Sequence, residues 1–170
     1  MNTEMDPLAD LLSAESFDAL LAREELRRGR TGEMLSVAMI DVDGVRRVNR
    51  EHGAGAGSEM LRMCVTTMRQ TLRAVDDVAR VGPDEFAVLL HATDSRSANV
   101  WADRFEDELA AASFEHVAGP VTCSIGIADT SREPTLMSAA AKAHRRMEVT
   151  QTMRKLRRAR EGGAESTGPA

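Results

Sequence analysis

The feature that most constrains the fold is residues 77–90, which predict two short strands joined by a tight turn. Apolar, strand-forming residues lie on both sides of Gly82, Pro83 and Asp84. Proline favours the second position of a type I turn, so these three residues suit the connection. The hairpin places the carboxylates of Asp84 and Glu85 at its tip. Carboxylates there are ordinarily solvated turn residues, so this stretch alone assigns them no chemistry.

Two more strands are predicted from apolar patterning. Residues 34–40 form a nearly continuous apolar run, which is typical of a strand buried on both faces. Residues 121–128 alternate apolar with small or polar side chains, as a half-buried strand does. Four helices are predicted as well, over residues 6–28, from Ser58 to the Leu72 region, over 95–112 and over 135–160.

Capping residues indicate where these helices begin and end. Ser58 is the predicted N-cap of the second helix, so the glycine-rich residues 53–57 before it are expected to form a flexible loop. Asp94 or Ser95 is expected to cap the third helix. Pro134 opens the fourth helix, and the glycines at 162–163 are expected to end it.

The predicted order is helix, strand, helix, strand, strand, helix, strand, helix. Without its first helix this is the split βαββαβ order, an α+β, ferredoxin-like antiparallel sheet with helices on one side. The N-terminal helix and a long basic C-terminal helix flank this core. A chain of 170 residues with 42% apolar content is expected to form one domain over residues 1–160, followed by a disordered tail over 161–170.

Charge is spread unevenly. The net charge is −5, yet residues 136–160 carry eight Lys or Arg against one acid, a local +7 that leaves −12 for the remainder. The negative total argues against DNA binding. The basic helix is ordinarily a solvated face, and an acidic protein partner is the alternative.

Cys64 and Cys123 lie beside apolar residues without metal-like spacing, so we expect buried, reduced thiols. No apolar run approaches the roughly 20 residues that span a bilayer, and no signal-like segment opens the chain. The sequence therefore predicts a cytoplasmic protein without membrane insertion.

The topology brings three acids together. Asp41 closes the strand at 34–40, which neighbours the hairpin, so it approaches Asp84 and Glu85. Mg²⁺ binds one or two carboxylates together with waters and substrate phosphates. Such an ion activates an attacking hydroxyl and neutralises a triphosphate. The spacing permits a metal site, and the alternative that these acids merely cap turns and strand ends stays open.

Several motifs in order resemble the GGDEF domain of diguanylate cyclases. They are Asp41-Val42-Asp43, Asn49, Gly53 with Gly57, Arg80-Val81-Gly82-Pro83-Asp84-Glu85-Phe86, an entry motif at Asp6–Leu11 and the strand Cys123–Ala128. The resemblance covers residues 6–154. It implies a palm-like sheet on which two GTP-loaded protomers meet as a homodimer and make cyclic di-GMP, each 3′ hydroxyl attacking the other's α-phosphate.

The resemblance also implies roles for the acids. Asp41 and Asp84 would bind Mg²⁺ with the Val42 carbonyl, and Glu85 would help to deprotonate or stabilise the attacking group.

Further roles concern the nucleotide and the product. Asn49 would hydrogen-bond guanine, and the backbone at Gly82 would pass close to the nucleotide. Arg73 and Asp76 match the family's Arg-x-x-Asp site, at which the arginine grips cyclic di-GMP.

Departures from the family pattern fall on the substrate contacts. Pro83 replaces a glycine whose N–H approaches the nucleotide, and proline has no N–H. Ser58 replaces an aspartate that pairs with guanine, and a hydroxyl offers no charged two-point acceptor. Ala54 replaces the usual histidine.

The C-terminal helix departs as well. Its best register puts Ala141, Arg145, Glu148 and Thr152 where the family has Asp, Tyr, Lys and Arg, so two phosphate-gripping cations are absent. We expect Arg145, Arg146 or Arg154 to substitute only if the helix turns them toward the triphosphate.

Three hypotheses follow. The first is a degenerate GGDEF domain in cyclic di-GMP signalling, non-catalytic or weakly active, that binds GTP, cyclic di-GMP or a protein partner. The second is an active diguanylate cyclase with relaxed purine selectivity, because Ser58 accompanies an intact acid trio. The third is a pure protein-interaction module acting through the basic helix.

Overall fold

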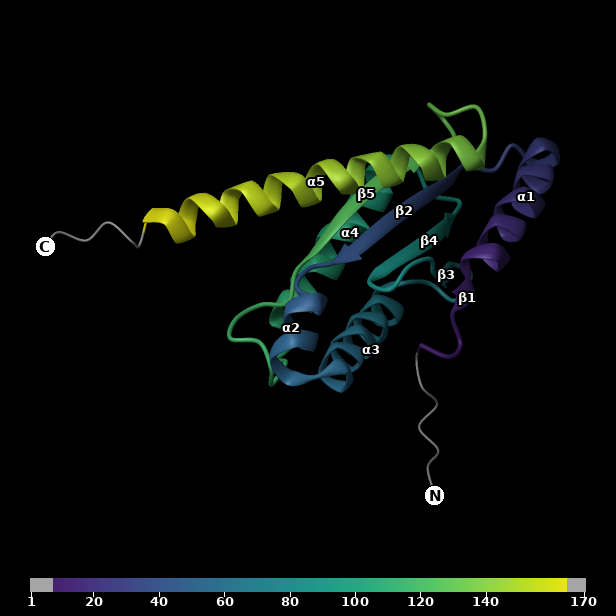
Figure 1. Ribbon diagram of the computed structural model, residues 1–170. Coiled ribbons are helices and arrows are strands. Elements are labelled where there is room, and N and C mark those ends of the chain that lie inside the picture. Colours follow the sequence, from purple (N-terminus) through teal and green to yellow (C-terminus); the bar gives the residue numbers. More distant parts are fainter. Residues whose placement is uncertain (1–7, 165–170) are drawn as a thin grey trace, which may run out of the picture.

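The structure is a computed structural model and describes residues 8–164, with side chains to residue 160 (Figure 1). Its elements in chain order are β1 (Leu12–Ser13), α1 (Ala14–Thr31), β2 (Leu35–Val42), α2 (Val45–His52), α3 (Ala54–Thr71), β3 (Asp77–Arg80), β4 (Glu85–His91), α4 (Ser95–Ala111), β5 (Cys123–Asp129) and α5 (Leu136–Ala164).

The strands form one five-stranded sheet in the order β1-β3-β4-β2-β5. The pairs β3–β4, β4–β2 and β2–β5 are antiparallel, which confirms the predicted α+β core with the hairpin beside the first core strand. The short strand β1 adds a parallel edge to β3.

The first predicted helix begins too early at residue 6. Within the described part of that segment, Leu12 and Ser13 pair with β3, and α1 starts at Ala14. Ser13 acts as its N-cap, because its hydroxyl accepts the backbone N–H of Ser16 at 3.1 Å. Residues 6 and 7 of the predicted helix lie outside the described part of the chain.

Helices cover both faces of the sheet: the core helices α3 and α4 lie on one side, as predicted for the βαββαβ core, and the flanking helices α1 and α5 cover the other. Alternate β2 side chains show this: Ala38, Ile40 and Val42 pack with α3 and α4, while Val37 and Met39 pack with α1 and α5. All eight residues of β2 are buried, because a central strand with two covered faces has no solvated side.

The glycine-rich segment at 53–57 is helical, so the predicted loop is wrong. Gly53 forms the N-cap with φ 89°, and α3 begins at Ala54. Ser58 is not the cap, since its hydroxyl donates to the Ala54 carbonyl inside the helix at 3.1 Å. Burial of Ala56 and Gly57 against the core outweighs the low helix propensity of glycine.

The predicted cap of α4 is confirmed, because the Asp94 carboxylate accepts the Ser97 N–H at 2.8 Å. Helix α5 starts at Leu136, after Pro134. It continues to Ala164, past the glycines at which we expect it to end. Residues 165–170 of the predicted tail lie outside the described residues.

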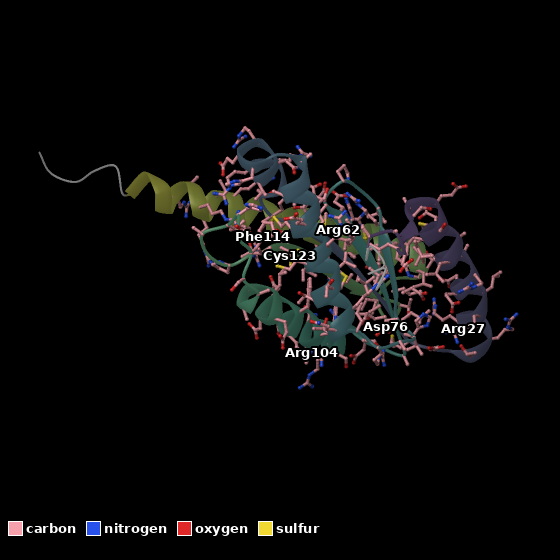
Figure 2. The ribbon with its side chains drawn as sticks, turned by 90° about the horizontal axis from the view of Figure 1, so that it is seen from below. Arg27, Arg62, Asp76, Arg104, Phe114 and Cys123 are labelled. Carbon is pink, nitrogen blue, oxygen red and sulfur yellow. The ribbon has the colours of Figure 1, made fainter. Side chains whose placement is uncertain are left out.

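Both cysteines are free and buried, as predicted, on the face of the sheet that carries α3 and α4. Figure 2 labels Cys123. Burial raises the pKa of the Cys64 thiol to about 12, so this thiol stays protonated. Among residues 8–164, no helix has both the length and the apolar character to cross a bilayer.

Asp129, at the end of β5, is expected to stabilise the fold. Its side chain is 4% exposed. Burial raises its pKa, but hydrogen bonds from Ser131 and Ser95 outweigh burial and bring the pKa to about 2. A folded-state pKa below the ordinary 3.8 contributes stability above that value, which is lost as the pH falls through the folded pKa.

We therefore expect Asp129→Asn to lower the free energy of unfolding by about 2 kcal/mol at pH 7. The loss should shrink as the pH approaches 2, where the parent carboxylate is also protonated. Urea titrations from neutral to acid pH measure both effects. If the parent chain and Asp129→Asn differed in free energy of unfolding by the same amount at every pH, this explanation would be wrong.

Candidate functional site

The acids at the end of β2 and in the β3–β4 loop share one pocket. Asp41 pairs with Glu85 across the β2–β4 ladder. The Val42 N–H donates to the Asp84 carbonyl at 2.9 Å, which fixes the loop beside the strand end. These residues line a single cavity together with Asp43, as the topology predicts.

Asp41 is the most enclosed of these acids, with 6% of its surface exposed. Burial raises its pKa, the hydrogen bond from Gln151 opposes that shift, and the neighbouring charges of Asp84, Asp43 and Glu85 raise the pKa further. The Gln151 amide donates to Asp41 Oδ1 at 2.8 Å. Helix α5 thus holds one carboxylate oxygen of Asp41 through Gln151.

Cations from α2 and α5 surround the acids. Lys155 and Arg158 line the same cavity as Gln151, and Arg46 Nε lies 3.8 Å from Asp84 Oδ2. Sequence reasoning missed all four residues. The spacing of Gln151, Lys155 and Arg158 at i, i+4 and i+7 is the signal that would have placed them on one helix face.

The residues that the sequence register matched to the family's cations do not reach this cavity. Glu148 and Thr152 are exposed and bond within α5, where the Thr152 hydroxyl donates to the Glu148 carbonyl. Gln151 and Lys155 line the cavity instead, and they are four residues apart, as are the family's Lys and Arg. The face of α5 that meets the acids is thus offset by three residues from the sequence register.

The other proposed substitutes have different contacts. Arg145 is exposed and does not line the cavity. Arg146 donates to the Ile127 carbonyl. Arg154 pairs with Glu106 and lies 3.7 Å from Asp43.

Asp43 anchors α5 over the site. Its side chain is 7% exposed, and Arg158 Nη2 approaches its carboxylate at 3.3 Å. The Thr122 hydroxyl donates to the same oxygen at 2.7 Å. A nearly buried carboxylate with these partners holds the helix against the strand end, so Asp43 positions the cations of α5.

The β3–β4 loop is wider than the predicted type I turn. The N–H groups of Val81 and Gly82 both donate to the Glu85 carbonyl, at 3.0 and 3.2 Å. Arg80 Nη2 donates to the Pro83 carbonyl at 2.7 Å and Arg80 Nε to the Gly82 carbonyl at 3.3 Å. Pro83 itself is exposed, so its ring stands at the tip of the loop.

Asn49 lies over Gly57 in α3, outside the acid cavity. A Cβ on Gly57 would lie 2.0 Å from Asn49 Oδ1, so the Asn49 side chain lies directly over Gly57, the neighbour of Ser58. Neither Asn49 nor Ser58 lines the cavity of Asp41 and Asp84. The expected base contacts are thus on α2 and in the first turns of α3.

The acid cavity suits a hard cation with few protein ligands. In the described residues no three His, Cys, Asp or Glu side chains are grouped to hold a metal ion. Asp41 and Asp84 remain as two carboxylates, and burial together with neighbouring charge already raises the pKa of Asp41. Mg²⁺ needs only one or two carboxylates with water and phosphate, so these residues fit Mg²⁺ bound together with a nucleotide.

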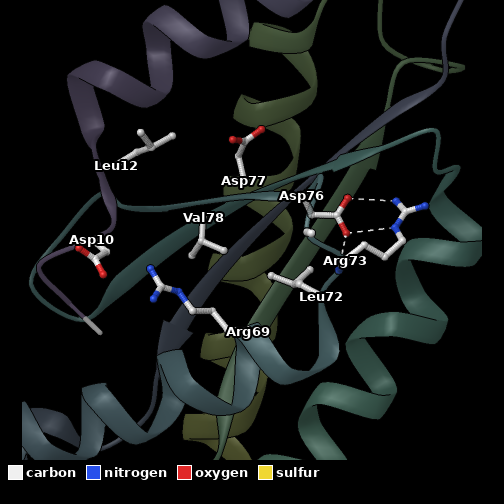
Figure 3. Close-up of a pocket in the computed structure, with 9 residues that line it drawn as sticks. Asp10, Leu12, Arg69, Leu72, Arg73, Asp76, Asp77 and Val78 are labelled. Atoms are coloured by element: carbon white, nitrogen blue, oxygen red, sulfur yellow. Dashed lines mark hydrogen bonds and ion pairs between the residues drawn. The ribbon is translucent and has the colours of Figure 1, made fainter. Parts of the chain in front are cut away.

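A second site surrounds Arg73 and Asp76 (Figure 3). Arg73 Nε and Nη2 donate to the two Asp76 oxygens at 3.2 and 3.0 Å. Asp76 is 2% exposed, and the His91 N–H donates to it at 3.1 Å. Arg73 Nη2 also donates to the His91 carbonyl and, at 2.8 Å, to Thr93.

These contacts fix one edge of the Arg73 guanidinium and leave the other edge open. Its side chain is 55% exposed, and its Nη1 donates to no described residue. Arg69, Asp10 and Asp77 line the same hollow. The site therefore presents a preorganised cation to solvent, which suits a phosphate group.

Comparisons with known proteins agree with this geometry. The profile of the family described as "Diguanylate cyclase, GGDEF domain" matches residues 3–156. Diguanylate cyclase DgcP of Pseudomonas aeruginosa is 36% identical over 124 residues, which are 72% of this chain and 18% of DgcP. Diguanylate cyclase DosC of Escherichia coli is 33% identical over 135 residues, which are 76% of this chain and 29% of DosC.

Solved structures give the same result. The GGDEF domain of PA1120 (TpbB or YfiN) from P. aeruginosa superposes with a TM-score of 0.79 at 28% identity, covering 86% of this chain and 87% of that one. Diguanylate cyclase SiaD of P. aeruginosa, solved with its activator SiaC, gives 0.77 at 26%, covering 87% and 58%.

This chain spans less than a third of the length of those two curated relatives. The family profile matches most of the sequence, and the sheet and acid cavity have the expected arrangement. The chain belongs to the diguanylate cyclase GGDEF-domain family.

Proposed function

We propose that this chain is a degenerate GGDEF domain in cyclic di-GMP signalling, which binds nucleotide and has little or no cyclase activity. The observation that carries the proposal is the hydrogen bond from Gln151 to Asp41 inside a cavity that keeps all three acids. Acids for a bound nucleotide are present, but the neutral Gln151 amide engages Asp41, and Glu148 and Thr152 stand at the positions where the resemblance implies phosphate-binding cations. Pro83 and Ser58 remove further contacts, and contacts to a triphosphate act together.

Asp41 and Asp84, with the Val42 carbonyl, are the proposed holders of Mg²⁺. When bound, this ion would neutralise phosphate charge and lower the pKa of an attacking hydroxyl. Glu85 pairs with Asp41 across the ladder and is the proposed proton acceptor at this edge of the sheet. Lys155 and Arg158 are placed to hold the outer phosphates.

Incubation with GTP or ATP and Mg²⁺ or Mn²⁺, followed by chromatography of the products, tests the proposal. We expect GTP binding by calorimetry and at most traces of cyclic dinucleotide. Asp84→Asn should abolish any trace, because it removes a proposed ligand of the ion. Robust formation of cyclic di-GMP by the parent chain would overturn the proposal.

Asn49 is the proposed base contact, and Gly57 allows it to lie where it does. Because a Cβ at Gly57 would overlap Asn49 Oδ1, Gly57→Ala must displace the Asn49 side chain. We expect the affinity for GTP to fall about tenfold, roughly the worth of one hydrogen bond. Fold stability should not fall, because alanine is the better helix former.

Gly55→Ala is the matched control, since no atom lies within 4 Å of a Cβ there. Calorimetry with GTP and thermal unfolding of both variants check the prediction. Equal GTP affinity in the parent chain and Gly57→Ala would argue against a role for Asn49.

An active cyclase with relaxed purine selectivity is the second candidate. Lys155 and Arg158 favour this candidate, because they bring cations to the acid cavity in place of the two that are absent at Glu148 and Thr152. The Ser58 hydroxyl is engaged by the Ala54 carbonyl, so no charged group is left at this position to select guanine. This candidate requires a homodimer and cyclic dinucleotide products from both GTP and ATP, and absence of turnover ends it.

Arg73 and Asp76 are the proposed binding site for cyclic di-GMP. The open edge of the fixed guanidinium suits a phosphate of the dinucleotide. A protein partner is the remaining possibility for this chain, as SiaD was solved with an activator protein.

A further inference from the structure

The outer surface of α5 has no partner within the described part of the chain. The apolar side chains that anchor the helix to the sheet are in its first half and end at Met147. From Lys155 to Arg160 every residue is exposed, and Figure 1 shows this end of α5 running out past the sheet. An isolated helical segment of this length is marginal in water, so a docked partner would stabilise it.

Apolar residues form a stripe on this surface. Val149, Met153 and Leu156 are 58%, 63% and 53% exposed. Their spacing of i, i+4 and i+7 puts them on one helix face. Gln151 and Arg158 lie on the opposite face, at the acid cavity. One face of α5 thus serves the acids, and the other presents contiguous apolar side chains to solvent.

Arginines flank the stripe. Arg145, Arg157 and Arg160 are exposed and make no hydrogen bond or ion pair with a described residue. Met153 and Arg157 also line a hollow beside Thr122 and Thr150, so the stripe has a groove along one side. We call Arg145, Val149, Met153, Leu156, Arg157 and Arg160 the α5 outer surface.

We propose that the α5 outer surface docks an acidic amphipathic helix of another protein. Leucine-like residues of that helix would cover Val149, Met153 and Leu156, which is the helix-in-groove mode of recognition. Its carboxylates would pair with the arginines, whose planar guanidinium groups suit two-point bonding to carboxylates. None of the residues of this surface lines the acid cavity or the hollow around Arg73.

Charge decides among the possible occupants. A second copy would bring one segment of charge +7 against another, and like charges facing each other are destabilising. An anionic membrane would be repelled by the rest of the chain, which carries a net charge of −12. The stripe also lacks the aromatic residues that are typical of helices at a membrane interface. An acidic helix contacts the outer surface of α5 alone and avoids both penalties.

A labelled helical peptide of about 18 residues, roughly five turns, is the probe. It carries leucines at i, i+4 and i+7 with glutamates on both flanks, and fluorescence anisotropy measures its binding to the full chain. We expect micromolar affinity, reduced at least tenfold by Met153→Glu or Arg157→Glu. Val100→Glu, at a residue 64% exposed on α4, is the control and should not change the affinity.

Three results would overturn the proposal. The first is no binding, or equal binding of a peptide with lysines in place of the glutamates. The second is an equal loss in Val100→Glu. The third is another occupant, seen as phosphatidylserine vesicles or a second copy binding the parent chain but not Met153→Glu. GTP binding should be unchanged in Met153→Glu, which separates this test from that of the proposed function.

Discussion

Gly126→Ala is expected to lower the free energy of unfolding by at least about 3 kcal/mol, at the severe end for overpacking. Gly126 lies in β5 directly beneath α5. A Cβ there would stand 2.1 Å from the Ala143 carbonyl oxygen and 2.2 Å from the Met147 nitrogen. Both are backbone atoms of a helix, so no side-chain rotation relieves the overlap.

The expected thermal shift follows from the size of the chain. A loss of this magnitude lowers the Tm of a 150–250-residue domain by roughly 6–12 °C. Because α5 must lift from the sheet, Lys155 and Arg158 should also move away from the acids, so nucleotide binding should weaken along with stability. Thermal and urea unfolding measure the first effect, and calorimetry with GTP measures the second.

Gly29→Ala is the matched control. Gly29 lies within α1, and no atom lies within 4 Å of a Cβ built there. Alanine should stabilise the fold by about 0.5–1 kcal/mol, because it restricts the unfolded chain and favours the helix. A Gly126→Ala variant as stable as the parent would show that α5 does not pack this closely on β5.

The parts of the fold that the sequence predicts are those specified locally. The apolar run of β2, the hairpin and the Asp94 cap each depend on neighbouring residues, and the structure contains all three. The loop predicted at 53–57 is wrong because the burial of Ala56 and Gly57 is a tertiary effect. Strand β1 was missed because two residues carry no periodic pattern, and only pairing with β3 defines it.

The candidate site also has a part that the sequence predicts and a part that it does not. The approach of Asp41 to Asp84 follows from topology and strand ends alone, so it was predictable. The contacts of Gln151 with Asp41 and of Arg158 with Asp43 join residues more than 100 positions apart. They depend on the rotation of α5 about its axis, which composition does not set. The comparison of the sequence with the family therefore did not reveal which residues of α5 meet the acids.

Arg73→Ala is expected to weaken cyclic di-GMP binding at least a hundredfold, or about 2.8 kcal/mol. Asp76, Thr93 and the His91 carbonyl accept hydrogen bonds from Arg73 and so hold its guanidinium with the free edge toward solvent. Ala92, between His91 and Thr93, has φ 46°, a left-handed backbone that is uncommon for residues other than glycine. This local backbone is expected to persist without ligand, so the protein bears the cost of orienting the arginine before binding.

Two further variants separate the geometry of Arg73 from its charge. Arg73→Lys keeps the charge but loses the planar two-point donor, so an intermediate loss is expected. Arg69→Ala removes a second arginine from the same hollow, one that makes no hydrogen bond or ion pair with a described residue. The affinity of Arg69→Ala for cyclic di-GMP should fall less than about tenfold. The Arg69 side chain has no fixed partner in the described part of the chain, so it loses more conformational entropy than Arg73 when it binds a ligand.

Calorimetry with cyclic di-GMP measures all three affinities, and circular dichroism confirms that each variant is folded. If Arg69→Ala weakens binding as much as Arg73→Ala, the site acts through general positive charge. If Arg73→Ala binds cyclic di-GMP as tightly as the parent chain, Arg73 and Asp76 have only a structural role, which is to join the end of α3 to β4. Asp76 accepts hydrogen bonds from Arg73 and from the His91 N–H in either role, so only the affinity distinguishes a binding site from a purely structural contact.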